Sequence, residues 1–166
     1  MRAGIALGSN LGERVENLTK ARAAISALPQ IAEPFLSSAI YETEPIDCEP
    51  GAGKFLNAVL EIGYDGSSRR LLRELQKIET ALGRPTEHAQ NQSRSIDLDL
   101  LYHGSEVSHE RDLQLPHPRL HQRGFVLHPL AEIQPDLILP GQTKTVRELS
   151  ETLPKSPSVV RATRQW

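Results

Sequence analysis

The stretch Arg94-Ser95-Ile96-Asp97-Leu98-Asp99-Leu100-Leu101 places two carboxylates two residues apart inside an apolar run. Side chains alternate between the faces of a strand, each residue advancing about 3.3 Å, so Asp97 and Asp99 are predicted to share one face. Ile96, Leu98 and Leu100 then point the other way, into a core. Partly desolvated acids repel each other and favour a cation between them, and oxygen ligands of this kind suit Mg²⁺ and phosphate chemistry. The alternative is a solvent-facing strand that happens to carry two aspartates.

Composition limits the kinds of protein this can be. A chain of 166 residues suits one compact domain spanning 1–166. Its 19 basic and 21 acidic side chains give a formal charge of -2, so no overall basic field points to a nucleic-acid partner. The one cysteine, Cys48, excludes an intramolecular disulfide and favours a reducing compartment. No apolar run reaches membrane length, so we expect a cytoplasmic protein with no membrane partner.

Hydrophobic periodicity predicts interleaved strands and helices. Strands are predicted over 3–7, 35–41, 55–62 and the run quoted above, with an extended segment over 107–115 and a last strand over 137–139. Helices are predicted over 15–28, over 68–82 after a serine cap, over 125–133, and from Thr143 or Thr145 to Leu153. The tail over 154–166 is expected to be mobile unless Trp166 docks. Uneven connections favour an α+β sandwich with a mostly antiparallel sheet over a doubly wound parallel sheet.

Three further segments carry polar chemistry that allows more than one interpretation. Phe55 and Asn57 share the face of their strand that lies opposite its apolar residues; they are either a surface pair or a ring and an amide for a heteroaromatic ligand. The stretch 116–125 holds two histidines and two arginines, which suits phosphate ligands or a solvated turn. The turn over 8–12 is rich in glycine, but it lacks the Lys-Ser/Thr ending of a phosphate-binding loop.

Five segments together resemble one enzyme family in their order and spacing. They are Gly8-Ser9-Asn10-Leu11, Phe55-Leu56-Asn57-Ala58, Glu79 through Gly83-Arg84, Arg94 through Asp99, and Pro116-His117-Pro118-Arg119 through Phe125. Over residues 3 to 140 the chain is similar to the 6-hydroxymethyl-7,8-dihydropterin pyrophosphokinases of folate biosynthesis. The resemblance implies a ferredoxin-like α+β sandwich, usually monomeric, that transfers the terminal diphosphate of ATP to the hydroxymethyl oxygen of the pterin and releases AMP.

The resemblance also implies roles for individual residues. Two Mg²⁺ ions would be held by Asp97 and Asp99 and would bridge the phosphates of ATP. The pterin would lie between the rings of Phe55 and Phe125, with Asn57 at its polar edge and the loop near Thr43 completing the pocket. The expected ATP contacts are Gln76, Glu79, Arg94, Leu100, His117 and Arg123. The expected catalytic residues are Arg84, Arg94, Asp97 and Asp99.

The chain departs from the family pattern in two places, one directly before Arg94 and one two residues after Arg84. Asn91-Gln92-Ser93 stand where the family often has a tryptophan and then Gly-Pro, and Thr86 stands where it has a second loop arginine. The segments 42–54 and 86–93 are the natural lids, because water must be excluded while the diphosphate moves. A binding module of the same fold that has lost catalysis is the main alternative, and a nucleic-acid binder would rest on the basic residues of 119–123 alone.

Overall fold

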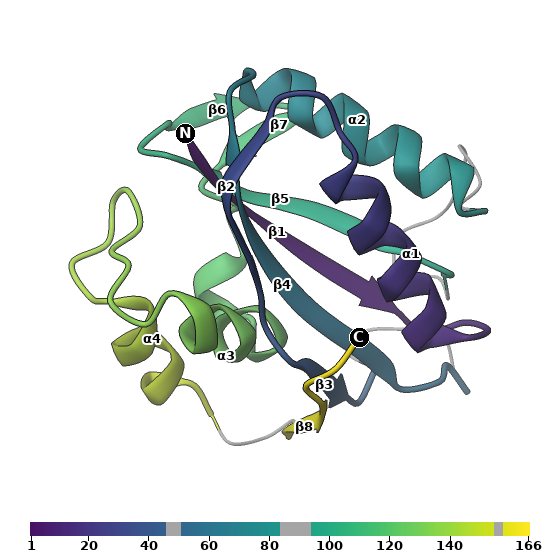
Figure 1. Ribbon diagram of the computed structural model, residues 1–166. Coiled ribbons are helices and arrows are strands. Elements are labelled where there is room, and N and C mark those ends of the chain that lie inside the picture. The colour runs from purple at the N-terminus through teal and green to yellow at the C-terminus, as the bar shows by residue number, and fades with distance from the viewer. Residues whose placement is uncertain (46–50, 84–93, 155–157) are drawn as a thin grey trace.

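A six-stranded antiparallel sheet forms the centre of the computed structural model, which describes residues 1–45, 51–83, 94–154 and 158–166 (Figure 1). The strand order is β5-β1-β4-β3-β8, and β2 pairs with β4 beside this path. The strands are β1 (Arg2–Ser9), β2 (Ile31–Ser37), β3 (Ile40–Thr43), β4 (Phe55–Tyr64), β5 (Asp97–His103) and β8 (Val159–Thr163). Every pairing in the sheet is antiparallel, which confirms the predicted fold class.

Helices cover both faces of the sheet (Figure 1). One face packs on α1 (Arg14–Ser26) and α2 (Ser68–Ala81), and the other on α3 (Gly124–Ile133) and α4 (Val146–Thr152). The alternation of side chains along β4 explains this division, since Leu60 belongs to the first core cluster and Val59 to the second. A sheet with both faces covered by helices has two cores, one on each face.

The helix boundaries follow local signals in the sequence. Ser67 caps α2 by accepting a hydrogen bond from the backbone N–H of Arg70, and the helix ends before Gly83, whose φ is 91°. Thr145 and Glu148 form a reciprocal capping box at the start of α4. These boundaries confirm the predicted starts and ends of both helices.

The predicted strand over 35–41 is wrong in extent, because the chain forms two strands with a break at Ser38. The backbone N–H of Ser38 donates to the carbonyl of Val59 at 2.9 Å, while its hydroxyl accepts from the N–H of Val59 at 3.0 Å. The side chain therefore takes the place of a backbone group in the ladder and separates β2 from β3.

Two predictions near the carboxyl-terminal half also need correction. The segment 107–115 is a hairpin of β6 (Ser108–Glu110) and β7 (Leu113–Leu115) instead of one extended segment. The predicted strand over 137–139 is wrong. The carbonyls of Leu137 and Leu139 accept hydrogen bonds from Val146 and Gln142, so this segment supports the start of α4 instead of joining a sheet.

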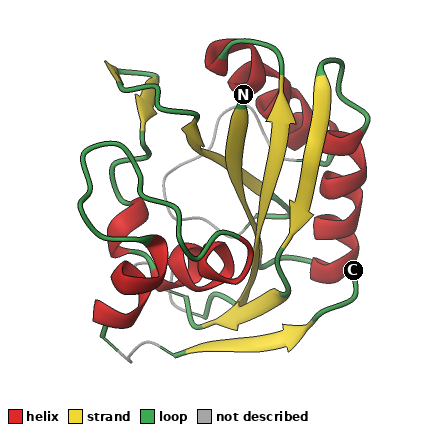
Figure 2. Cartoon of the chain, turned by 60° about the vertical axis from the view of Figure 1, so that its left-hand side comes forward, coloured by secondary structure: helices red, strands yellow, loops and turns green. Residues whose placement is uncertain are grey.

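The tail was expected to be mobile unless Trp166 docks, and residues 158–166 adopt the docked arrangement. β8 pairs with β3 along the edge of the sheet, where Figure 2 shows it leading to the C-terminus. The indole N–H of Trp166 donates to the carbonyl of Ser38 at 2.9 Å, so the tryptophan docks.

Several sequence-based expectations lie outside the described residues, namely those for Cys48, Arg84, Thr86 and Asn91. The loop expected over 42–54 begins later than predicted, because Glu42 and Thr43 belong to β3. Within the described ranges, no helix is both long and apolar enough to cross a membrane.

Candidate active site

The site is built on a row of residues that crosses three strands. β1 lies between β4 and β5, and its Gly8 is in register with Asn57 on β4 and with Asp97 on β5. Neighbouring strands lie about 4.8 Å apart, so the backbones that carry Asn57 and Asp97 stand about 10 Å from each other with only a glycine between them. Two residues earlier on β1, and on the same face of the strand, Ala6 is paired with Asp99. Small residues on the middle strand therefore leave a depression between taller polar neighbours.

A pocket of about 390 Å³ lies over this floor, between the sheet and the amino-terminal end of α3. Asp97 and Asp99 both line it, which confirms that they share one face of β5, while Leu98 and Leu100 belong to the core on the other face. The wall contains all four residues expected around the pterin and four of those expected around the phosphates: Thr43, Phe55, Asn57, Phe125, Arg94, Asp97, Asp99 and Arg123.

One end of the pocket is aromatic and carries a fixed amide. Asn57 and Thr43 are only 5% and 4% exposed, and the amide nitrogen of Asn57 donates to the hydroxyl of Thr43 at 2.9 Å. This bond directs the carbonyl oxygen of Asn57 over the floor, where a methyl group on Gly8 would lie 3.3 Å from it. Phe55 and Phe125 line the same pocket from the sheet and from α3. The arrangement offers apolar rings and a directed hydrogen-bond acceptor to a flat polar ring.

The rest of the pocket wall carries two arginine–aspartate pairs, and it meets the aromatic part where the guanidinium of Arg123 lies 5.4 Å from the centre of the Phe125 ring. A guanidinium nitrogen of Arg94 lies 3.0 Å from the carboxylate of Asp97, and a guanidinium nitrogen of Arg123 lies 3.3 Å from that of Asp99. Burial lowers the pKa of Arg123, and the neighbouring Asp99 carboxylate partly offsets this effect. The Nε of Arg94 is buried and has no hydrogen-bond partner within the described part of the chain.

Asn10 positions Arg94, and the sequence analysis missed this role. The backbone N–H of Arg94 donates to the side-chain oxygen of Asn10 at 2.8 Å, and the backbone N–H of Asn10 donates to the carbonyl of Arg94 at 3.2 Å. The predicted turn over 8–12 begins later than expected, since Gly8 and Ser9 belong to β1. The only available signal was an asparagine directly after a strand, which is also common in ordinary turns.

A second pocket of about 410 Å³ adjoins the first and shares Asp99 and Arg119 with it. Leu100 and His117 line it. The ring nitrogen Nδ1 of His117 accepts a hydrogen bond from the backbone N–H of Arg119 at 3.2 Å, so the neutral ring carries its proton on Nε2. Burial lowers the pKa of His117, Asp99 opposes this, and Arg123 and Arg119 reinforce it. The second pocket therefore presents a neutral imidazole beside two arginines.

The structure does not bring every predicted residue to these pockets. Gln76 is exposed on α2, and neither Gln76 nor Glu79 lines either pocket. Glu79 is 7% exposed, and its carboxylate accepts a hydrogen bond from the backbone N–H of Leu98 at 2.8 Å. Glu79 thus supports the strand that carries the two aspartates. Three further residues line the first pocket and were not predicted as site residues: Leu153, Pro154 and Val159.

A family model described as 7,8-dihydro-6-hydroxymethylpterin-pyrophosphokinase (HPPK) matches residues 4–135. The chain belongs to the HPPK family. A 2-amino-4-hydroxy-6-hydroxymethyldihydropteridine pyrophosphokinase of Haemophilus influenzae is 37% identical over 154 residues, covering 90% of this chain and 93% of the relative. A protein of the same description from Methylorubrum extorquens is 43% identical, with 89% of this chain and 90% of the relative covered.

Solved structures agree with the HPPK fold. An HPPK-DHPS in complex with substrates superposes with a TM-score of 0.69 at 13% identity over 91% of this chain. Wild-type HPPK-DHPS of Plasmodium falciparum gives a TM-score of 0.69 at 15% identity over 90% of this chain. The chain spans 42% and 44% of those two structures' chains, so it corresponds to part of each. At these identities the likeness supports the fold alone.

Proposed function

We propose that this HPPK-family chain transfers diphosphate from ATP to the hydroxymethyl group of 6-hydroxymethyl-7,8-dihydropterin and releases AMP, as a step of folate biosynthesis. One observation carries the proposal: a single pocket joins an aromatic end bearing a fixed amide to an end bearing two arginine–aspartate pairs. The names of the relatives agree with it, since they describe pyrophosphokinases of a hydroxymethyl dihydropteridine.

The aromatic end suits the pterin. The rings of Phe55 and Phe125 can stack on the faces of a bicyclic ring, and the carbonyl oxygen of Asn57 can accept a hydrogen bond from an N–H at its edge. The hydroxymethyl group then extends along the floor toward Asp97, which stands across Gly8 from Asn57.

The charged end suits the phosphates. Arg94 and Arg123 supply planar donors that match phosphate oxygens, and the neutral ring of His117 can donate from Nε2. Because the two pockets share Asp99, ATP in the second pocket can present its β-phosphorus to the hydroxymethyl oxygen in the first. The new O–P bond forms as the bond to the AMP oxygen breaks.

The two aspartates suit Mg²⁺ when a nucleotide is bound. Within the described ranges, no cluster of three or more His, Cys, Asp or Glu side chains could hold a metal ion, so phosphate oxygens and water would have to complete the coordination of ions held by Asp97 and Asp99. Two such ions would neutralise phosphate charge and stabilise the in-line displacement. Because each aspartate is now paired with an arginine, metal binding would release Arg94 and Arg123 toward the phosphates.

We further propose that the chain acts as a cytoplasmic monomer. Residues of one chain line both pockets, and its single cysteine fits a reducing compartment. Sedimentation of the active enzyme at the concentration used for assays tests the oligomeric state. A dimer as the active species would contradict it.

The reaction itself is tested by product analysis. The purified chain with ATP, Mg²⁺ and the hydroxymethyl dihydropterin should form AMP, and ADP as the product would contradict the proposal. Asp97→Asn and Asp99→Asn should each lower kcat by about 100-fold or more while the circular dichroism spectrum stays unchanged. Asp136→Asn is the matched control, because the Asp136 carboxylate is 86% exposed and lines neither pocket. Ligand binding without AMP release would favour a non-catalytic binding module.

A further inference from the structure

We infer that Val159 on β8 is a pterin-binding residue that forms the outer wall of the first pocket, so that the tail over 158–166 is a functional part of the enzyme. The inference rests on the proposed function, because it assigns the ligand of the first pocket as the pterin. Val159 lies well beyond residue 135, where the family match ends, yet it lines the same pocket as Phe55 and Asn57.

Strand register places Val159 at the pocket. Phe55 on β4 is paired with Thr43 on β3, and Thr43 is paired with Val159 on β8. The three residues form one row across the sheet and line one pocket. Since β8 is the last strand of the sheet order, removing it would leave Thr43 on an open edge. The row therefore ends in an apolar side chain that closes the outer side of the pterin pocket.

Val159 also closes the gap between the sheet and α3. A methyl group built on Gly124 would lie 3.2 Å from a methyl carbon of Val159 and 3.7 Å from one of Leu153. Both side chains thus pack against the first residue of α3, directly before the pocket residue Phe125. Glycine at this position lets the tail approach the helix closely enough to form a continuous wall.

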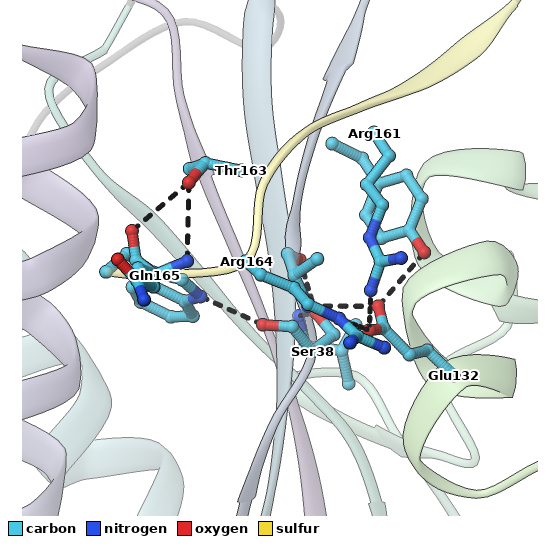
Figure 3. A network of polar contacts seen from close by, with 10 residues as sticks. Ser38, Glu132, Arg161, Thr163, Arg164 and Gln165 are labelled. Carbon is cyan, nitrogen blue, oxygen red and sulfur yellow. Dashed lines mark hydrogen bonds and ion pairs between the residues drawn. The ribbon is translucent and has the colours of Figure 1, made fainter.

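Charged contacts hold β8 against α3 next to this wall. Glu132 on α3 forms ion pairs with Arg161, at short range, and with Arg164 at 3.8 Å (Figure 3). The same carboxylate accepts hydrogen bonds from the hydroxyl of Tyr41 and the backbone N–H of Ala39, both at 3.0 Å. One carboxylate therefore joins β3, β8 and α3. This network fixes the strand that carries Val159.

Trp166 anchors the far end of the tail on the opposite side of the sheet. Its indole donates to the carbonyl of Ser38, and the guanidinium of Arg22 on α1 stacks 5.2 Å from its ring centre. The ring also packs against the first core cluster. Pairing with Thr43, together with the contacts of Glu132 and Trp166 further along the tail, sets the position of Val159 before any ligand arrives, which is the property that a pocket wall requires.

Two substitutions at Val159 and one at its neighbour test the inference by calorimetric binding of the pterin and, separately, of ATP. Val159→Phe adds bulk to the pocket and should weaken pterin binding by about tenfold or more, while ATP binding stays within about twofold. Val159→Ala removes packing and should weaken pterin binding by about threefold. Val160→Phe is the control, because Val160 is 57% exposed and does not line the pocket, and it should leave both affinities unchanged.

Trp166 is the chain's single tryptophan, so its emission spectrum without ligand reports whether the tail stays docked in each variant. If Val159→Phe shifts that spectrum, the added bulk has displaced the tail. The pterin affinity of Val159→Ala, which adds no bulk, then tests the inference. Wild-type pterin affinity in both Val159 variants, with the wild-type chain forming AMP, would overturn the inference alone. A wild-type chain that neither binds the pterin nor forms AMP would overturn the proposed function instead.

Discussion

The side-chain amide of Asn57 on β4 is held by the hydroxyl of Thr43 on β3, in a hydrogen bond of 2.9 Å between two buried groups. The two residues are not register partners, since Thr43 pairs with Phe55 and Asn57 with Tyr41. The bond therefore crosses the ladder diagonally and turns the amide oxygen of Asn57 toward Gly8 and the pocket. A ligand N–H meets an acceptor whose direction is already set, so little conformational entropy is lost on binding.

We predict that Thr43→Val weakens pterin binding by about three- to tenfold, because the substitution keeps the size of the side chain but removes the acceptor for the amide. Affinity for ATP should not change. Binding calorimetry with each ligand measures both effects. Thr19→Val on α1 is the control, since the Thr19 hydroxyl bonds to the local carbonyl of Val15 on an exposed helix face. Wild-type pterin affinity in Thr43→Val would show that the amide needs no such support.

We predict that Gly8→Ala weakens pterin binding about tenfold or more and leaves the fold intact. The added methyl group would stand 3.3 Å from the amide oxygen of Asn57 and 4.0 Å from Phe55, inside the depression between the strands. Pterin KM and the melting temperature measure the two effects separately.

Gly12→Ala is the matched control for Gly8→Ala. Gly12 has a φ of 66°, and a methyl group there would meet nothing within 4 Å. This variant should lose about 1 kcal/mol of stability through backbone strain while keeping its pterin affinity. An equal loss of pterin affinity in both variants would contradict the assignment of Gly8 as the pocket floor.

Alternation of side chains was enough to predict much of the sheet and of the site. It placed Asp97 with Asp99, and Phe55 with Asn57, on the correct faces because a buried face tolerates no slip of one residue. It could not show that these two pairs face each other across Gly8, because that depends on the order and register of three strands distant in sequence.

The misses have a common physical origin in long-range contacts. The β-branched residues of Val159–Thr163 are compatible with a strand but do not identify its partner, and its place in the sheet comes from pairing with β3 and from the contacts of Glu132 and Trp166. The apolar run over 137–139 has the composition of a strand, but the carbonyl of Leu137 bonds to the first residue of α4 and that of Leu139 to Gln142 in the connecting turn. Contacts with distant parts of the chain determine the conformation of both segments, and the local sequence does not show which residues make those contacts.

We predict that Glu79→Ala lowers the free energy of unfolding by about 2 kcal/mol, because it leaves the buried N–H of Leu98 without its charged acceptor. β5 lies at the end of the sheet order, so no further strand is available to satisfy this donor. Glu79→Gln keeps an acceptor and should retain most of the stability. Urea unfolding measures both, and Gln76→Ala on the exposed face of α2 is the control. A direct contact with ATP, which remains a prediction, would make Glu79→Gln raise the KM for ATP.

We predict that His117 makes stability fall on acidification. Its pKa in the folded protein lies below the ordinary value of 6.5, chiefly because the ring is buried. As the pH falls through 6.5, the unfolded chain takes up a proton before the folded protein does, so the contribution of His117 to stability is complete above pH 6.5 and is lost toward the lower folded pKa. His117→Gln should remove this component from the pH dependence of urea unfolding. His121→Gln, at an exposed position nearby, should keep it.

The same histidine should couple nucleotide binding to proton uptake. A polyphosphate beside His117 adds negative charge where Arg119 and Arg123 now oppose protonation, so the pKa of the bound form must rise above that of the free form. Binding then takes up a proton between these two pKa values, and affinity for ATP increases as the pH falls through that interval. Calorimetry in buffers of different ionisation enthalpy measures the uptake, and comparison with His117→Gln removes the titration of ATP itself. Equal proton uptake in the wild-type and His117→Gln proteins would place the phosphates away from this ring.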